Sequence, residues 1–285
     1  MPFSITGTLL TCAAIFAIVC TTCGKVVHAQ GPQPWAKERL EKSPRHGEWV
    51  MLNHDNRPVN CFITYPEAKD KATAVIVIHE IFGLTDWVRG VTDQLAEAGY
   101  IAIAPDLLWG KAANGEGTDA IVKAEGGEAV RRHIFELPSD QITADLNAVY
   151  DYASKLPSCN GKVVVCGYCW GGGESFRYTT TNKNLKACFS FYGPPPTKQD
   201  DVARINCPVY GFYAGNDNRI DAMLPAITDL MKKESKTYEP VTYEGAGHGF
   251  MRDGEDPTST APNHVANVKA RDEAWTRWKE LLKSM

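Results

Sequence analysis

The chain has 285 residues, 44% of them apolar, which suits one large α/β domain with or without extensions. Its formal net charge is −4 and it has no long basic run, so we expect no nucleic acid or other polyanion as a partner. No internal repeat and no linker divides it, and we predict a single folded domain over residues 48–285.

The first 29 residues differ from the rest in composition. An apolar segment at 9–20 is too short to span a bilayer as a helix, and Val27-His28-Ala29 ends on a small residue. This pattern predicts a signal peptide over residues 1–29, cleaved after Ala29, and an exported protein, periplasmic or secreted, with no membrane attachment after cleavage. Because no Lys or Arg precedes the apolar segment, an uncleaved membrane anchor is the alternative.

Loss of the predicted signal peptide removes three of the nine cysteines. The other six are Cys61, Cys159, Cys166, Cys169, Cys188 and Cys207. An exported chain of this size needs no disulfide framework to fold. Several of these cysteines lie in or beside apolar strand-like runs, so we expect buried thiols, and the sequence leaves pairing among Cys159, Cys188 and Cys207 open.

The predicted elements alternate between strands and helices. Residues 30–47 form a polar N-terminal lead, and a turn-rich segment between two strand-like runs, 48–52 and 59–65, predicts a hairpin. Later strands are predicted at 74–79, 101–104, 163–166, 185–192, 208–214 and 236–243, and helices at 86–98, 139–152, 222–233 and 264–282. A glycine-rich excursion with one weak helical pattern occupies 107–137. We therefore predict an α/β fold with a mostly parallel, doubly wound sheet flanked by helices.

Residues 163–178 carry the strongest motif. A buried valine strand runs into Gly167-Tyr168-Cys169-Trp170-Gly171, and a plausible helix follows. A strand, a sharp glycine-flanked turn and a helix form a nucleophile elbow, here with Cys169 in place of the usual serine. The positive end of the helix dipole favours a thiolate. A cysteine after a buried strand is more often a packing residue, so a base and an acid must come from elsewhere in the chain.

Chemistry in such a sheet gathers at the carboxyl ends of the strands. Asp217 follows the strand at 208–214, although an aspartate in a Gly-Asn-Asp turn is ordinarily a turn former. His248, between Gly247 and Gly249, follows the strand at 236–243. Cys169, Asp217 and His248 thus occur in the α/β-hydrolase order of nucleophile, acid and histidine. We expect Cys169 to attack an acyl carbon, His248 to move the proton and Asp217 to orient His248.

These motifs together resemble the dienelactone hydrolase family. The resemblance covers about residues 48–284 and is carried by Gly167-Tyr168-Cys169-Trp170-Gly171-Gly172, Gly215-Asn216-Asp217, Gly247-His248-Gly249-Phe250 and His79-Glu80-Ile81-Phe82-Gly83. It implies an α/β-hydrolase fold with a Cys-His-Asp triad, which hydrolyses a lactone or small ester through a thioester intermediate. It also implies that no metal or organic cofactor is needed.

The resemblance assigns roles to further residues. Glu80 matches a glutamate that contacts the resting cysteine and influences its protonation, although a solvent-facing loop carboxylate is the simpler interpretation. The backbone N–H groups of Ile81 and Trp170 match the oxyanion hole. Arg252 matches one of two arginines that bind a substrate carboxylate.

The second arginine of the family pattern has no counterpart in this chain. The matching region reads Leu108-Trp109-Gly110-Lys111, and Lys111 lacks the bidentate fork of an arginine. Trp109 and the excursion after it can form a more apolar pocket. We therefore expect a broader preference for small esters or lactones than for an authentic dienelactone.

Two other functions compete with ester hydrolysis. Cys166-Gly167-Tyr168-Cys169 is also a Cys-x-x-Cys, and an exported protein could use it as a thiol–disulfide oxidoreductase. That interpretation leaves Asp217 and His248 unexplained. A binding module that kept the fold without the chemistry is the third, but all three triad residue types are present. For the hydrolase we expect a monomer whose partner is a small-molecule ester or lactone.

Overall fold

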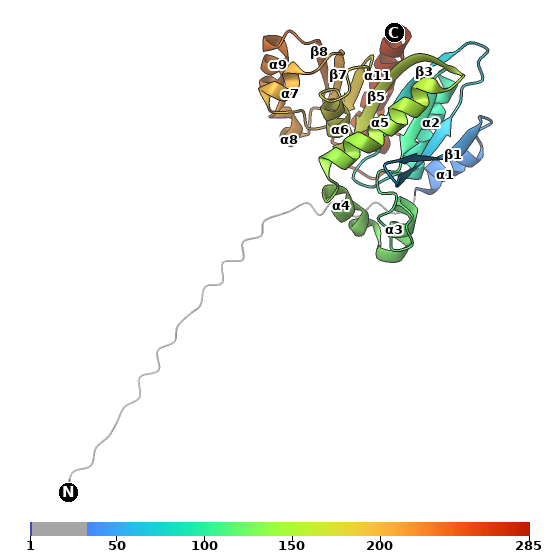
Figure 1. Ribbon diagram of the computed structural model, residues 1–285. Coiled ribbons are helices and arrows are strands. Elements are labelled where there is room, and N and C mark those ends of the chain that lie inside the picture. The colour runs from blue at the N-terminus through green and yellow to red at the C-terminus, as the bar shows by residue number, and fades with distance from the viewer. Residues whose placement is uncertain (2–32) are drawn as a thin grey trace.

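A computed structural model describes residue 1 and residues 33–285 (Figure 1). The predicted signal peptide lies outside the described residues apart from Met1, so its cleavage and the export of the protein stay predictions. Within residues 33–285, no helix combines the length and the apolar character needed to cross a membrane.

The described residues form one eight-stranded sheet in the order β1-β2-β4-β3-β5-β6-β7-β8. Strand β2 pairs antiparallel with β1 on one side and with β4 on the other. All other neighbouring strands pair in parallel. The strands are β1 (Gly47–His54), β2 (Arg57–Thr64), β3 (Ala72–Ile78), β4 (Ile101–Pro105), β5 (Cys159–Tyr168), β6 (Cys188–Phe191), β7 (Val209–Ala214) and β8 (Tyr238–Tyr243). The predicted α/β class and the opening hairpin are confirmed.

Helices cover both faces of the sheet (Figure 1). They are α1 (Pro34–Glu41), α2 (Asp86–Glu97), α3 (Thr118–Glu125), α4 (Gly127–Phe135), α5 (Ser139–Lys155), α6 (Trp170–Tyr178), α7 (Gln199–Ala203), α8 (Asn218–Asp221), α9 (Leu224–Lys233), α10 (Phe250–Asp253) and α11 (His264–Lys283). Side chains of α3 to α7 and α9 pack on one face, and those of α1, α2, α10 and α11 pack on the other. Alternate residues of the fully buried strand β3 enter the two cores, which is why its sequence is continuously apolar.

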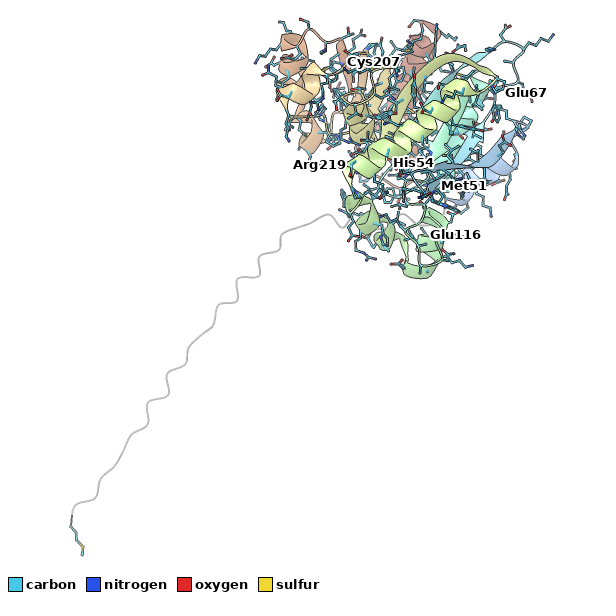
Figure 2. All side chains as sticks on the ribbon, in the orientation of Figure 1. Met51, His54, Glu67, Glu116, Cys207 and Arg219 are labelled. Atoms are coloured by element: carbon cyan, nitrogen blue, oxygen red, sulfur yellow. The ribbon has the colours of Figure 1, made fainter. Side chains whose placement is uncertain are left out.

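The hairpin is fastened to α5 by charge. Asp145 of α5 is completely buried, and its carboxylate lies 2.6 Å from His54 Nε2 and 2.9 Å from Arg57 Nε. Figure 2 shows His54 beside α5. A buried carboxylate requires such partners, because its desolvation is otherwise unfavourable.

The structure contains more helix than the sequence indicated: besides the short helices α7, α8 and α10, two further regions differ. The N-terminal lead includes α1, and the excursion at 107–137 contains two helices, α3 and α4, rather than one weak pattern. In α1 the only buried residue is Ala36, so the helix has no apolar period that would reveal it. Tertiary contacts, rather than intrinsic propensity, hold such a short helix in place.

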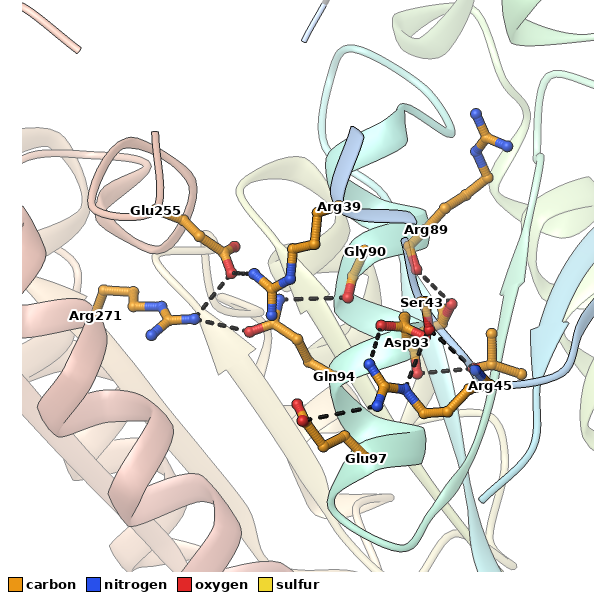
Figure 3. Close-up of polar contacts among 12 residues, drawn as sticks. Arg39, Ser43, Arg45, Arg89, Gly90, Asp93, Gln94, Glu97, Glu255 and Arg271 are labelled. Atoms are coloured by element: carbon orange, nitrogen blue, oxygen red, sulfur yellow. Dashed lines mark hydrogen bonds and ion pairs between the residues drawn. The ribbon is translucent and has the colours of Figure 1, made fainter. Parts of the chain in front are cut away.

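The contacts that fasten α1 centre on Glu255, after α10 (Figure 3). Its carboxylate pairs with Arg39 of α1 and with Arg271 of α11 at 2.8 Å, and it accepts a hydrogen bond from Trp87 Nε1 at 2.8 Å. Only 8% of the Glu255 side chain is exposed. Three segments far apart in the sequence therefore meet on one nearly buried charge.

Removal of the Arg39 guanidinium should destabilise the protein. We expect Arg39→Ala to lower the free energy of unfolding by about 1–2 kcal/mol and Tm by roughly 2–8 °C. Lys37→Ala is the matched control from the same helix, because its partner Glu41 is exposed and 3.8 Å away; its effect should stay below about 0.5 kcal/mol. Thermal melts of both variants test this, and equal effects would contradict it.

Candidate active site

Cys169 occupies the sharp turn between β5 and α6. Its backbone has φ 56° and ψ −118°, which is strained for a residue with a Cβ. The flanking glycines are required because backbone crowds against them. A Cβ on Gly167 would lie 2.0 Å from the carbonyl oxygen of Gly171, and one on Gly171 would lie 2.3 Å from that of His79. The elbow predicted from the sequence is present.

The structure brings Cys169, Asp217 and His248 together. His248 Nε2 lies 3.0 Å from the Cys169 sulfur, and His248 Nδ1 lies 2.5 Å from Asp217 Oδ2. Each residue follows a different parallel strand, β5, β7 and β8, at its carboxyl end. Asp217 is 7% exposed, so its carboxylate depends on the imidazole as a partner. The carboxylate, imidazole and sulfur thus form a continuous line.

The surroundings of His248 favour its protonated form. Burial disfavours the imidazolium, but hydrogen bonds to Asp217 and Cys169, together with their negative charge, outweigh this and raise the pKa of His248 to about 10. One third of the side chain is exposed, so one edge of the ring reaches solvent. An imidazolium between a carboxylate and a sulfur can supply a proton to a leaving group at neutral pH.

Glu80 is paired differently from the expectation. We expected it to contact the resting Cys169, but within the described residues its carboxylate pairs with Arg252 Nε at 2.7 Å and accepts a hydrogen bond from the Tyr192 hydroxyl at 3.4 Å. Glu80 is 2% exposed, so a cationic partner compensates for its burial. The solvent-facing alternative is wrong. Arg252 also lies over the ring of Phe82, 5.2 Å from its centroid.

Sequence reasoning did not single out Tyr192. It follows β6, has a φ of 41°, and packs edge-on against the His248 ring with centroids 5.1 Å apart. Its pKa is raised, first by burial and then by Glu80, so the hydroxyl stays protonated and can donate to that carboxylate. The unusual φ cannot be read from a tyrosine in an apolar run, so no signal in the sequence marked it.

The two amides predicted for an oxyanion hole are unoccupied by protein acceptors. Trp170 N–H belongs to the first turn of α6, where helical amides lack intrahelical partners. Within residues 33–285, neither the Trp170 N–H nor the Ile81 N–H donates to another group of the protein. Both residues flank the elbow, because β3 and β5 are neighbouring strands. The two amides are thus free to bind an oxygen.

His79 holds this region together as a neutral ring. It is fully buried, and burial lowers its pKa. Its Nε2 accepts from Leu107 N–H at 3.3 Å, so Nδ1 carries the proton and donates to the Glu80 carbonyl at 2.9 Å. The ring also stacks on Trp170, with centroids 5.6 Å apart. His79 therefore links the Glu80 loop, the elbow and the chain after β4.

The excursion after β4 is joined to the same loop. Thr118, the first residue of α3, packs against Gly83 and accepts a hydrogen bond from Leu84 N–H at 3.1 Å. Its own N–H and hydroxyl donate to Asp106 at 2.7 and 2.8 Å. Sequence reasoning assigned no role to Thr118, because a threonine in a glycine-rich excursion carries no pattern.

A model of the dienelactone hydrolase family matches residues 59–285 of the chain. The chain belongs to this family. A candidate carboxymethylenebutenolidase of Saccharolobus solfataricus is 29% identical over 262 residues, which cover 82% of this chain and 97% of the relative. A protein of the same description from Synechocystis is 30% identical and covers 82% of this chain and 95% of its own length. The protein is accordingly a dienelactone hydrolase-like hydrolase of carboxylic esters.

Solved structures agree on the fold. A candidate dienelactone hydrolase from Klebsiella pneumoniae superimposes with a TM-score of 0.71 at 23% identity, over 85% of this chain and 99% of the other. A dienelactone hydrolase-like promiscuous phosphotriesterase from metagenomic libraries gives 0.70 at 20% identity, over 84% and 98%. At these identities the likeness establishes the α/β-hydrolase fold.

The remaining predicted site residues of this dienelactone hydrolase-like chain lie in the loop after β4. Trp109 is half-buried beside Gly117, and within residues 33–285 no hydrogen bond or ring contact joins it to Cys169, Asp217 or His248. Lys111 is half-buried in the same loop. Within the described residues, no group of three His, Cys, Asp or Glu side chains is arranged to hold a metal ion.

The six cysteines of the described chain are free thiols. Cys166 is fully buried beneath the elbow, and burial raises its pKa well above the ordinary value. A redox partner of Cys169 would need an accessible, ionisable thiol. The geometry therefore gives no support to the oxidoreductase alternative.

Gly171 should tolerate no side chain. We expect Gly171→Ala to destabilise the protein by more than about 3 kcal/mol and to abolish ester hydrolysis, because the new methyl group would overlap two carbonyl oxygens. Gly90→Ala is the matched control: Gly90 lies inside α2 with nothing near its Cβ position, so alanine should stabilise by up to about 1 kcal/mol. Melting curves and ester assays test this, and a Gly171→Ala protein with unchanged Tm would refute it.

Proposed function

We propose that this enzyme hydrolyses small carboxylic esters or lactones through a thioester on Cys169, with His248 as the proton carrier and Asp217 as its orienting group. One observation carries the proposal: sulfur, imidazole and carboxylate form a continuous line at the carboxyl ends of β5, β8 and β7. Family membership supports the reaction class. To this reaction class we add the reacting atoms: the sulfur of Cys169 and Nε2 of His248.

The first half-reaction forms the thioester. The Cys169 thiolate attacks the acyl carbon, and the carbonyl π-electrons move to oxygen, where the N–H groups of Ile81 and Trp170 stabilise the charge. The tetrahedral intermediate collapses as the carbon–oxygen bond to the leaving group breaks. The His248 imidazolium donates its Nε2 proton to that oxygen, so an alcohol leaves, or remains attached where the substrate is a lactone.

The second half-reaction restores the enzyme. A water molecule attacks the thioester carbon while neutral His248 accepts one of its protons. The carbon–sulfur bond then breaks, the acid is released, and Cys169 is again a thiolate beside an imidazolium. Asp217 keeps Nδ1 protonated throughout, so Nε2 is the nitrogen that exchanges the proton.

The charges near the sulfur support a broad substrate class. Arg252 matches the family position for a substrate carboxylate, but Glu80 neutralises it at 2.7 Å. The second arginine of the family pattern is absent, and Lys111 offers at most a point charge. We keep Trp109 as a contact for the acyl or alcohol group, because Asp106 and Thr118 join its loop to the Glu80 loop. A neutral small ester therefore fits at least as well as an anionic lactone.

Hydrolysis should depend on Cys169 and not on Cys166. We expect Cys169→Ala to lower kcat/KM for a short-chain aryl acetate by at least about 10³-fold. Cys166→Ala is the matched control three residues away, because it removes an equally polarisable thiol that cannot reach the substrate. Mass spectrometry of quenched wild-type enzyme should find the acyl group on Cys169.

Three outcomes of this experiment have defined meanings. Equal activity of wild type and Cys169→Ala would refute the mechanism. Loss of hydrolysis in a folded Cys166→Ala as well would contradict the assignment of the reaction to Cys169 alone. A carboxylate-bearing lactone assayed alongside the acetate tests substrate breadth, and a large advantage for the anionic lactone would overturn the broad preference.

The pH profile should report the His248–Asp217 pair. Because the pKa of His248 is about 10, kcat/KM should fall on the alkaline side near pH 10, where the imidazolium loses the proton it gives to the leaving group. Asp217→Asn removes a partner that raises this pKa, so the alkaline limb should move to lower pH and kcat should drop about 10²–10⁴-fold. Asp221→Asn, one helical turn away, should leave the limb in place. An unmoved limb in Asp217→Asn would contradict the assignment.

A further inference from the structure

The loop that carries His248 has no regular structure of its own. It joins β8 to the short helix α10, and Gly245 and Gly249 have φ values of 74° and 82°, which side chains rarely adopt. Asp217 holds the imidazole at one nitrogen. A group that fixes the backbone beside His248 must come from another element.

Asn267 of α11 meets this requirement. Its side chain is buried with 2% exposure, and its Oδ1 accepts a hydrogen bond from Gly247 N–H at 2.8 Å, one peptide before His248. Its Nδ2 donates to Asp253 Oδ2 at 2.5 Å, at the end of α10. One amide therefore ties both ends of the segment 247–253, which carries His248 and Arg252.

The partner carboxylate is prepared for this bond. Burial disfavours its charge, but hydrogen bonds from Asn267, Ser259 and His264 outweigh burial and lower the pKa of Asp253. The charged form is a pure acceptor, so it selects the Nδ2 side of the Asn267 amide and turns Oδ1 toward Gly247. The charge of Asp253 thus sets the orientation of the Asn267 amide.

We propose that Asn267 is a positioning residue for His248: it fixes the backbone of the catalytic loop so that Nε2 stays in reach of the Cys169 sulfur. This rests on the proposed function. Asn267 touches neither substrate nor sulfur, and it acts through Gly247. Reacting groups displaced by about 1 Å lose rates on the order of 10²-fold, so a loosened loop should affect turnover far more than substrate binding.

The experiment is a donor–acceptor swap in the full-length enzyme. Asn267→Asp keeps the acceptor for Gly247 N–H but sets two carboxylates against each other at Asp253. We expect kcat for an aryl acetate to fall about 10–100-fold with KM within about threefold. The double variant Asn267→Asp with Asp253→Asn restores a donor–acceptor pair in reverse, and kcat should return to within about threefold of wild type. Glu273→Gln, further along α11, is the control and should keep kcat, because its side chain is half-exposed and pairs only loosely with the exposed Lys269 at 3.8 Å.

A second readout needs no substrate. The rate at which iodoacetamide alkylates Cys169 reports the imidazolium–sulfur contact, so it should fall in Asn267→Asp and recover in the double variant, while Tm reports folding separately. A merely structural residue would lower Tm without this pattern. If Asn267→Asp fails to fold, the double variant decides: wild-type kcat supports the proposal, and a folded double variant with low kcat overturns it.

The outcomes separate this proposal from the proposed function. Wild-type activity that survives Cys169→Ala would remove the catalytic scheme and this inference with it. Activity that depends on Cys169 but is unchanged in a folded Asn267→Asp would overturn only the role of Asn267. A folded double variant whose kcat stays low would also overturn the role of Asn267, because a positioning role predicts that the restored hydrogen bond restores kcat.

Discussion

The site depends on one steric constraint, the close approach of backbone around the elbow. The end of β5, the start of α6 and the end of β3 come so near that a Cβ at Gly171 would lie 2.3 Å from the His79 carbonyl oxygen. This crowding accompanies the strained conformation of Cys169, whose sulfur lies 3.0 Å from His248 Nε2. Trp170 follows Cys169 directly at the start of α6, and Ile81 follows the end of the neighbouring strand β3. The same packing therefore positions Cys169 and the first amide of α6.

Around this elbow the charges are arranged as two separate pairs. Asp217 with His248 faces the sulfur, while Glu80 with Arg252 lies beside it, and Tyr192 contacts a member of each pair. Both carboxylates are nearly buried, so each depends on its cation. Neutral residues then hold the loops: His79 and Thr118 fix the Glu80 loop, and Asn267 fixes the His248 loop. Because these three side chains are neutral, they add no charge beside either ion pair.

The sequence predicted the sheet and the triad because both leave local patterns. Apolar runs marked the parallel strands, and glycines marked the elbow and the His248 loop. It missed α1, whose single buried residue gives no period, and Tyr192, Thr118 and Asn267, whose roles exist only through partners distant in the chain. For Glu80 the family motif identified the residue, but it did not indicate Arg252, because the partner of a buried carboxylate depends on which cation the fold brings near.

By itself, then, the sequence determined the fold class, the order of Cys169, Asp217 and His248 along the chain, and the family, because periodicity and short motifs are written in neighbouring residues. The tertiary structure alone decided distances and pairings. It set His248 Nε2 at 3.0 Å from the Cys169 sulfur and paired Glu80 with Arg252. It also buried Cys166 fully and brought the Asn267 side chain into hydrogen-bond distance of Gly247 N–H. These contacts link residues up to 172 positions apart in the sequence, and they form only when strands and helices pack into one core.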